Sequence, residues 1–334
     1  MSQSGPLLRE VRPRLARIQG PVKDRLEVVL DELRRIVLSD FEMIEEVNQY
    51  LLLMRGKLFR PTLLLLSNQV GDQPSPEADT LAALVELVHL ATLVHDDAVD
   101  HSVLRRGLPT VNALWTHQVA VIMGDYLYSR SVLELVRLRN LDAIQALARA
   151  SNEMSIGEMR QLTSYDALDF SEEAYFRLIA AKTASLMCAA CEMGAMVGVE
   201  AYRDPLARFG HNLGMAFQIA DDLLDYTGSE AQTGKPVSHD LRERKVTLPL
   251  VGALKSASGA AAAEIRTFFT MVDPGEEEIR RIVEIVEDLG GLEFARTRAR
   301  SFADRAEDAL SEVESGPATD ALRESVAYAI DRSR

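Results

Sequence analysis

Apolar residues recur at three- and four-residue spacing along most of this 334-residue chain, and runs of strict apolar–polar alternation are absent. That spacing puts apolar side chains on one face of a helix, so it predicts helices almost throughout. Proline and glycine gather at short breaks between the patterns. The longest patterns span residues 77–101, 111–139, 142–161, 171–199 and 204–226, and a further set runs from 247 to the C-terminus. We therefore expect an all-α fold of about a dozen helices, a single domain over residues 1–334.

Two aspartate clusters stand at the ends of strongly apolar helical patterns. Their members are Asp96, Asp97 and Asp100 in the first, and Asp221, Asp222 and Asp225 in the second. Residues four apart on a helix point the same way, so the first and last aspartates of each cluster share a face. The middle aspartates lie about 100° round the helix, where they support the outer pair.

This arrangement costs free energy unless a cation neutralises it. Like charges at helical spacing destabilise a helix by roughly 0.2–0.5 kcal/mol, and unpaired carboxylates in apolar surroundings cost far more. A solvated acidic helix end is the plain alternative, but two clusters on apolar helices argue against it. Carboxylate oxygens suit Mg²⁺, which proteins commonly share with substrate phosphates. An EF-hand is a poor fit, because its ligands come from a glycine-turned loop.

Basic residues accompany both clusters. They are Lys57 and Arg60, Arg105 and Arg106, Lys182 beside Thr183, and Lys235 and Lys245. Each alone has a plain interpretation as part of a solvated face, except that Lys182 lies inside an apolar run where an unpaired lysine is costly. Together they predict a cavity that holds two diphosphates, whose charge calls for cations beside the metal.

Composition excludes several other classes of protein. The formal net charge of −14 argues against a nucleic-acid partner. Cys188 and Cys191 lack the two further ligands that a zinc site needs, so two buried thiols are the simpler interpretation. The N-terminus has no apolar signal core, and no stretch reaches the roughly 18 consecutive apolar residues of a membrane span. We expect a cytoplasmic protein without a transmembrane segment, with at most weak membrane association through an apolar product.

The combined motifs resemble those of the trans-isoprenyl diphosphate synthases, long-chain members in particular, over roughly residues 50–250. The matching segments are GKLFRP at 56–61, DDAVDHSVLRRG at 96–107, GDYL at 124–127, KT at 182–183, FQIADDLLD at 217–225 and GKP to TLP at 234–249. Two ordered aspartate motifs with these basic partners make the resemblance specific. It implies the family's all-α fold around a deep central cavity, and a homodimer.

The resemblance also implies a role for each matching residue. Isopentenyl diphosphate would be bound by Lys57, Arg60, His89 and Arg106. An allylic diphosphate would be contacted by Arg105, Lys182, Thr183, Gln218, Lys235 and Lys245. About three Mg²⁺ ions would be held by Asp96, Asp100, Asp221 and Asp225, with Asp97 and Asp222 completing the catalytic set. His89 has a competing interpretation, because a lone helical histidine is more often a core residue.

The implied reaction needs no strong protein nucleophile. Metal and cations withdraw charge from the leaving diphosphate, so that the allylic C–O bond ionises to a carbocation. The isopentenyl double bond attacks this carbocation, and a proton then passes to the released pyrophosphate. Oxygen dipoles of Thr183 and Gln218 would stabilise the developing positive charge.

Two positions depart from the family pattern. Members usually carry glycine where this chain has Ser238 and Arg244. Glycine there permits a tight loop over the phosphates. These two side chains must fit a turn that glycine normally makes, so the loop around Lys235 and Lys245 is where this site should differ from its relatives.

Product length should be set by the helix above the first cluster, because the growing tail runs from Asp96 toward the N-terminus of that helix. Each helical turn rises about 5.4 Å, close to one isoprene unit. No aromatic side chain stands one or two turns up, where the residues are Ala91, Thr92, Val88 and Leu87. We therefore predict a product of about C20 or longer, with about C30 to C50 favoured. Further candidates for the cavity floor are Val132, Met123 and Tyr128.

Other functions fit part of the pattern. A geranylgeranyl or farnesyl diphosphate synthase would share the motifs and differ only in product length. A terpene cyclase would bind Mg²⁺ and a prenyl diphosphate, but it has one such aspartate motif and no need of Lys57, Arg60 and His89. A regulatory subunit of a heteromeric synthase would have eroded aspartates, whereas both clusters here are whole.

Overall fold

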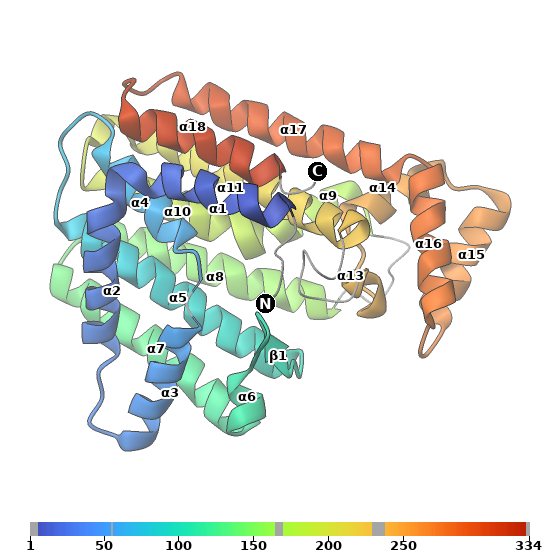
Figure 1. Ribbon diagram of the computed structural model, residues 1–334, viewed down its shortest axis with the longest axis horizontal. Helices are drawn as coiled ribbons and strands as arrows, with labels where there is room; N and C mark the ends of the chain where they lie inside the picture. The colour runs from blue at the N-terminus through green and yellow to red at the C-terminus, as the bar shows by residue number, and fades with distance from the viewer. Residues whose placement is uncertain (1–5, 55, 164–169, 229–237, 332–334) are drawn as a thin grey trace.

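The computed structural model describes residues 6–54, 56–163, 170–228 and 238–331, and these are helical almost throughout (Figure 1). The first half contains α1 (Pro6–Gln19), η1 (Gly20–Val22), α2 (Lys23–Val37), α3 (Glu42–Leu53), α4 (Phe59–Gln69), α5 (Glu77–Val99), α6 (Val111–Leu114), α7 (His117–Leu138) and α8 (Leu141–Thr163). The second half contains α9 (Glu172–Ile179), η3 (Ala180–Ala184), α10 (Ser185–Met196), η4 (Glu200–Tyr202), α11 (Arg203–Thr227), α13 (His239–Arg242), α14 (Leu248–Ser256), α15 (Gly259–Thr270), α16 (Glu276–Asp288), α17 (Gly291–Leu310) and α18 (Pro317–Ile330). The all-α prediction is confirmed.

The exception to helix in the described residues is a hairpin that follows the first aspartate cluster. Strands β1 (Leu104–Arg105) and β2 (Leu108–Pro109) pair antiparallel, with Leu104 opposite Pro109. The tight turn between them has positive φ at both central residues, 56° at Arg106 and 79° at Gly107. The hairpin therefore turns Arg105 back to Asp97 near the end of α5, while Arg106 reaches the Met54 carbonyl.

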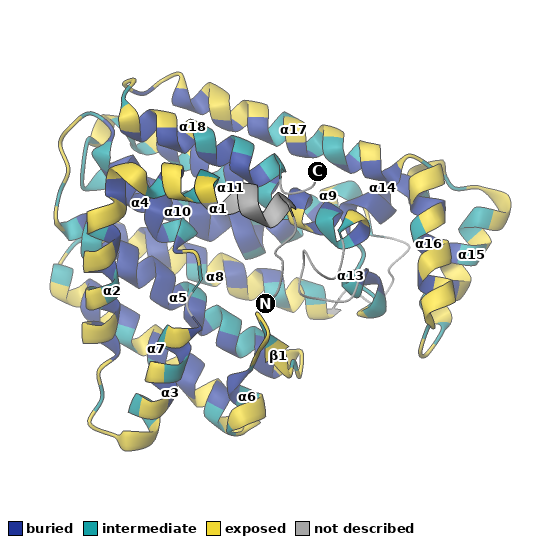
Figure 2. Cartoon of the chain, viewed as in Figure 1, coloured by how far each residue is buried: buried dark blue, intermediate teal, exposed yellow. Residues whose placement is uncertain are grey.

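Helix α5 lies inside the bundle and carries the first cluster at its C-terminal end. It packs against α7, α4 and α2, and Figure 2 shows its residues and those of α10 mostly buried. Two segments, Glu77–Val99 and Glu172–Met196, are long and apolar enough to cross a membrane, but 67% and 78% of their apolar windows are buried within the fold. Packing against neighbouring helices thus accounts for their apolar character.

Two hydrophobic clusters make up the core. The larger lies around α2, α4, α5 and α10, and the smaller around α9, α14, α16 and the C-terminal half of α11. Helix α11 contributes Leu206 and Phe209 to the larger cluster and Ile219 and Leu223 to the smaller. The second aspartate cluster, which follows at the end of α11, is therefore fixed by the smaller cluster.

Two predicted helices are interrupted. The pattern at 111–139 is broken near Trp115 into α6 and α7, and Thr116 caps α7 by accepting a hydrogen bond from the Val119 N–H. The pattern at 171–199 contains a π-helical turn, η3, between α9 and α10. Single π-turns within α-helices are frequent at functional sites, and this one carries Lys182 and Thr183.

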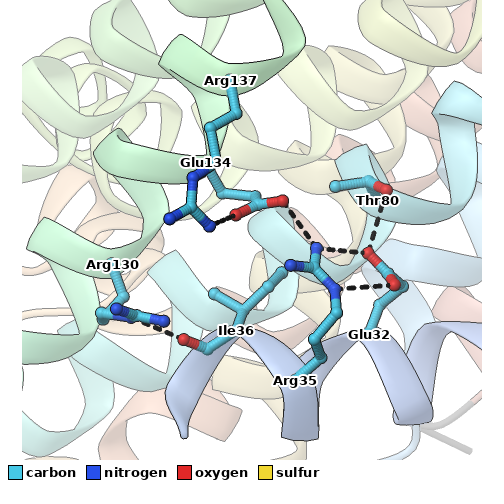
Figure 3. Close-up of polar contacts among 7 residues, drawn as sticks. All are labelled: Glu32, Arg35, Ile36, Thr80, Arg130, Glu134 and Arg137. Carbon is cyan, nitrogen blue, oxygen red and sulfur yellow. Dashed lines mark hydrogen bonds and ion pairs between the residues drawn. The ribbon is translucent and has the colours of Figure 1, made fainter. Parts of the chain in front are cut away.

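A charged network joins α2, α5 and α7 away from the aspartate clusters (Figure 3). The Arg35 guanidinium donates to both oxygens of Glu32 at 3.0 and 2.8 Å and to Glu134 at 2.6 Å. Glu134 is buried and also accepts from Arg137, while the Thr80 hydroxyl donates to Glu32. Several charge-assisted bonds between three helices hold α5 and α7 in one register at this end.

Candidate active site

The three aspartates of the first cluster have different surroundings. Asp97 is buried and accepts two hydrogen bonds from Arg105, Nε to Oδ2 at 2.7 Å and Nη2 to Oδ1 at 2.8 Å. Asp96 is half-buried, and Asp100 is exposed at the end of α5. The outer pair is thus available on one helix face, whereas the middle aspartate holds the β-hairpin arginine.

Asp96 is a carboxyl group adapted to a cation. Its pKa is raised to about 6, chiefly by burial and also by the neighbouring carboxylates Glu158 and Asp100, while Lys182 and Arg105 oppose the rise. When burial and like charges disfavour the ionised form of a carboxyl group, a bound divalent cation stabilises that form most strongly. Asp96 therefore has the electrostatic environment expected of a metal ligand.

Lys182 approaches the first cluster from the π-turn. Its ammonium group forms an ion pair with Glu158 and donates a hydrogen bond to Gln161 Oε1 at 3.2 Å. The adjacent Thr183 is buried, and its hydroxyl donates to Gln218 Oε1 at 2.7 Å. The extra residue in the turn lets both consecutive side chains reach the same cavity.

The three aspartates of the second cluster also have different surroundings. Asp222 is buried and accepts from Tyr175 Oη at 2.5 Å and from Gln218 Nε2 at 2.8 Å. Asp225 accepts the backbone N–H groups of His239 and Asp240 at 3.1 and 3.0 Å. Asp221 is exposed, whereas Asp222 is buried and Asp225 is half-buried.

The described residues contain no preformed group of three His, Cys, Asp or Glu side chains with metal-binding geometry. The solvent-accessible carboxylates lie on two helices, with Asp96 and Asp100 at the end of α5 and Asp221 on α11. Such a donor set suits a cation that completes its shell with water and phosphate oxygens, as Mg²⁺ does. The residues present therefore fit a hard divalent cation bound together with a diphosphate.

A cavity of about 690 Å³ brings these motifs together. Its polar lining comes from Asp100, Gln161, Tyr175, Lys182, Thr183, Gln218, Asp222, Asp240, Glu243, Arg244, Lys245 and Thr247. Apolar side chains such as Phe170, Leu178 and Val246 complete it. Residues from distant parts of the sequence thus meet around a space large enough for a small charged substrate with an apolar tail.

Lys245 lies where the two clusters face each other. Burial lowers its pKa, but a 2.6 Å ion pair with Glu243, together with the charges of Asp240 and Asp100, produces a net rise. Lys245 therefore stays charged and is coupled to carboxylates of both α5 and the loop after α11. Lys235, the other lysine predicted here, lies outside the described residues.

The two positions that lack the family's glycine both have left-handed backbone. Ser238 has φ 57° and Arg244 has φ 61°. The Arg244 guanidinium donates to the Phe268 carbonyl at 2.7 Å and lies 5.5 Å from the centre of the Phe268 ring. The loop thus keeps the glycine-type turn, and the arginine side chain ties it to α15.

Ser238→Gly should stabilise the protein by about 0.5–1 kcal/mol. A left-handed non-glycine residue costs roughly 1–2 kcal/mol, and the greater conformational entropy that glycine loses on folding cancels part of the gain from removing this strain. The bond from the residue 238 N–H to the Asp225 carbonyl is unaffected. We expect a Tm higher by about 1–3 °C. Ser301→Gly, inside α17, is the control and should lower Tm. Equal losses from both variants would show that Ser238 is unstrained.

A second group of cations lies at the other side of α5. Arg60 is half-buried, and its Nε has no hydrogen-bond partner among the described residues. Arg106 donates to the Met54 carbonyl at 2.9 Å, and Lys57 donates to Tyr328 Oη at 3.1 Å. Arg106 also lies so close to Gly56 that a Cβ there would be 2.8 Å from its guanidinium. An unsatisfied buried guanidinium atom beside further cations is suited to an anion.

His89 and Glu86 complete this second group. Burial, together with the charges of Arg60, Arg106 and Arg105, lowers the pKa of His89 well below its usual value, so the ring is neutral near pH 7. Glu86 is only 3% exposed, and burial raises its pKa while the two arginines lower it. Glu86 is a site residue that we did not predict. Its position one turn before His89, as a charge in an apolar run, was the available signal.

The residues predicted to control product length lie on two helices. Leu87, Val88 and Ala91 are buried in α5, and Thr92 is half-buried with its hydroxyl bonded to the His89 carbonyl. Met123 on α7 is buried as well. Two further candidates differ, because Tyr128 and Val132 lie on the exposed face of α7. Within one chain these two do not form a cavity floor.

Helix α7 approaches the first cluster closely at Gly124. A Cβ at this position would lie 2.2 Å from His95 Nε2. The His95 ring meets the Val121 carbonyl at 3.1 Å and Asp125 at 3.4 Å. Because His95 directly precedes Asp96, this contact helps to fix the end of α5 against α7.

Gly124→Ala should displace the His95 ring and reduce kcat/KM by about ten- to hundredfold, since small misplacements of reacting groups carry penalties of that size. Steady-state kinetics and Tm measure it. Gly20→Ala is the control, because nothing lies within 4 Å of a Cβ there. A His95→Ala change in the Gly124→Ala background should recover the lost stability. Unchanged kinetics in Gly124→Ala would contradict the positioning role of the contact.

Comparison with known proteins agrees with this geometry. The sequence pattern of the family described as polyprenyl synthetase matches residues 41–286. The all-trans-nonaprenyl-diphosphate synthase (geranyl-diphosphate specific) of Rhodobacter capsulatus is 35% identical over 317 residues, covering 94% of this chain and 97% of the relative. Component 2 of the heptaprenyl diphosphate synthase of Geobacillus stearothermophilus is 34% identical over 313 residues, covering 92% and 95%.

A solved structure extends the similarity to three dimensions. The polyprenyl synthase of Caulobacter crescentus, complexed with calcium and isoprenyl diphosphate, superposes with a TM-score of 0.89. The two chains share 33% identity, and the match covers 100% of this chain and 99% of the other. The aspartate clusters, the cation groups and the helical fold therefore have one explanation: this chain belongs to the polyprenyl synthetase family and is a prenyltransferase.

Proposed function

We propose that this enzyme condenses isopentenyl diphosphate with an allylic diphosphate, head to tail, to form a long all-trans polyprenyl diphosphate in the cytoplasm. The main observation in support of this proposal is that residues of both aspartate clusters line one cavity together with Lys182, Thr183, Gln218 and Lys245. The proposal takes residues 1–334 to form one catalytic domain. The two hydrophobic clusters are continuous, because Phe302 packs against both.

In this proposal the allylic diphosphate binds between the aspartate clusters. Mg²⁺, held by Asp96, Asp100 and Asp221, supplies charge neutralisation at the leaving diphosphate. Lys182 exchanges its Glu158 partner for a phosphate oxygen, and Lys245 offers a second cation from the opposite side. Thr183 and Gln218 line the same cavity as these cations, and their oxygens stabilise positive charge as the C–O bond ionises.

Isopentenyl diphosphate binds the second group of cations in this proposal. Arg60, with its unpartnered Nε, and Arg106 and Lys57 bind its diphosphate. The neutral His89 contributes a hydrogen bond without adding charge. Because this group lies against α5, the isopentenyl double bond approaches the allylic carbon from the side of the first cluster.

The proposed metal binding should depend on pH through Asp96. In the metal-free enzyme its raised pKa of about 6 means that a proton competes with Mg²⁺ at lower pH. The Mg²⁺ concentration for half-saturation should therefore rise about tenfold between pH 7 and pH 5. Calorimetric titration of the enzyme without diphosphate measures this change. Affinity that is the same at both pH values would remove Asp96 from the proposed metal site.

Product length and primer form the finer part of the proposal. The similar synthases are named for nonaprenyl and heptaprenyl products, and one is named as specific for geranyl diphosphate. We propose a product in the same range, about C35 to C45, consistent with small side chains at positions 91 and 88. Geranyl and farnesyl diphosphate are the primers to compare.

A homodimer is the proposed assembly. The outer face of α7 exposes an apolar row formed by Val121, Ile122, Tyr128, Val132, Leu133 and Val136. An apolar patch of this kind marks an interface. A heteromeric synthase is the second candidate, because one relative is a component of a heptaprenyl diphosphate synthase. Light scattering after gel filtration should give a dimer, with Leu133→Glu monomeric and Val272→Glu, in the exposed turn before α16, unchanged.

The reaction is tested with the purified chain, Mg²⁺, labelled isopentenyl diphosphate and either primer, followed by chromatographic sizing of the product. We expect a discrete long-chain diphosphate. A cyclised hydrocarbon formed from the primer alone would point to a terpene cyclase. Label incorporation only after addition of a second protein would point to a component of a heteromeric enzyme. Asp221→Asn is the matched inactive control.

A further inference from the structure

A chain of hydrogen bonds links a buried tyrosine to the proposed allylic site. Tyr175, on α9, is 1% exposed, and its hydroxyl donates to Asp222 Oδ2 at 2.5 Å. The other oxygen of Asp222 accepts from Gln218 Nε2 at 2.8 Å. The carbonyl oxygen of Gln218 in turn accepts from the Thr183 hydroxyl at 2.7 Å. All four residues line the same cavity, and they come from three separate elements, α9, α11 and η3.

The direction of each bond follows from the donors available. A tyrosine hydroxyl has one proton, so Tyr175 gives it to the carboxylate. Asp222 accepts at both oxygens, from Tyr175 Oη at one and from Gln218 Nε2 at the other. Burial and the neighbouring Asp240 and Asp221 raise the pKa of Asp222, and these two donors oppose that rise by stabilising the carboxylate. The amide is thereby oriented with its nitrogen toward Asp222 and its oxygen toward Thr183. The Thr183 hydroxyl donates its only proton to the Gln218 carbonyl oxygen. The lone pairs of the threonine oxygen therefore remain available to groups in the cavity.

Amide orientation matters for the charge that the cavity must stabilise. With this orientation, the negative ends of the Gln218 and Thr183 dipoles meet in the cavity that Lys182 also lines, at the proposed site of ionisation. A Gln218 amide turned by half a rotation would present its N–H groups there and oppose a developing cation. Buried dipoles held by a fixed partner need no reorganisation during the reaction.

We propose that Tyr175 is a positioning residue that fixes, through Asp222 and Gln218, the orientation of the Thr183 hydroxyl at the allylic site. Tyr175 touches no substrate in this arrangement. Its hydroxyl occupies the Asp222 oxygen that would otherwise be an unsatisfied acceptor in a buried position, so the carboxylate keeps one rotamer. This inference rests on the proposed prenyl transfer, because the hydroxyl acts at the step in which the allylic bond ionises.

Tyr175→Phe keeps the buried ring and removes the first bond of the chain. We expect kcat to fall by about ten- to hundredfold, the usual cost of losing such a supporting partner. KM for both substrates should stay within about twofold, because the lost interaction acts in the transition state. Tyr226→Phe is the matched control: this buried tyrosine on α11 has its hydroxyl bonded to Thr247, outside the relay, and its kcat should be unchanged.

A double-mutant cycle separates positioning from a structural role. In a Thr183→Val background the last group of the relay is gone, so adding Tyr175→Phe should lower kcat by less than about threefold. If Tyr175→Phe costs the same factor in both backgrounds, or leaves wild-type kcat unchanged, the relay is overturned. Wild-type product formation in the same assay tests the proposed reaction separately. Should Tyr175→Phe fail to fold, Gln218→Met replaces it in the cycle with the same expected coupling.

Discussion

Asp96→Asn should lower kcat by about a thousandfold, the scale of losing a central electrostatic group in an active site. The substitution keeps the shape of the side chain and removes one of the three carboxylates proposed to bind the metal. It also removes the negative charge that interacts favourably with the Lys182 ammonium group. Steady-state kinetics at saturating Mg²⁺ and both substrates measures the change.

Two comparisons make this result specific. Asp304→Asn alters an exposed aspartate on α17 and should leave kcat unchanged. Raising the Mg²⁺ concentration should recover only a small part of the Asp96→Asn activity, because an amide oxygen is a weak substitute for a carboxylate. Activity within threefold of wild type at all Mg²⁺ concentrations would exclude Asp96 from metal binding. Melting temperatures identify any variant whose loss is one of folding.

Ala91→Tyr should shorten the product to about C15, because an aromatic ring one turn above Asp96 would occupy the space of the fourth isoprene unit onward. Ala91 is 3% exposed and is followed toward the N-terminus of α5 by the buried Val88 and Leu87. The diphosphate is held in place at Asp96, so a bulky residue above it limits the tail and leaves the first condensation intact. Chromatography of dephosphorylated products measures length directly.

Graded substitution strengthens this test. Ala91→Leu should give a product of intermediate length, since leucine extends less far than tyrosine. Overpacking of a buried position costs about 1–3 kcal/mol, so both variants are compared at a temperature well below their measured Tm. An unchanged product distribution in both variants would show that the tail does not pass Ala91. In that case another helix forms the floor of the cavity.

The local sequence was a good guide to helices and a limited guide to side-chain roles. Helical spacing correctly predicted α5, α8 and α11 to within about two residues. It missed the break at Trp115 and the π-turn at Lys182, because both depend on contacts with other helices. Within the first cluster, spacing distinguished the outer aspartates from Asp97 but did not reveal that Asp97 binds Arg105.

The loop after α11 shows how family patterns and structure combine. Two missing glycines predicted a departure near Lys245, and the backbone at Ser238 and Arg244 keeps the left-handed conformation that glycine normally takes. The side chain of Arg244 compensates through its contact with Phe268. That contact joins residues 24 positions apart on different elements, so no local pattern predicts it.

By itself, the sequence determined the helices, the shared face of each aspartate pair and the cations that accompany them, because helical periodicity and charge are local properties. Only the tertiary structure decided which partners the carboxylates bind, since Asp97, Asp222 and Asp225 accept hydrogen bonds from Arg105, from Tyr175 with Gln218, and from the loop backbone. It also decided that Glu86 lies beside Arg60 and that Tyr128 and Val132 face outward. The physical reason is that a buried polar group is satisfied by whichever partner packing brings within reach, and packing joins segments far apart in the chain.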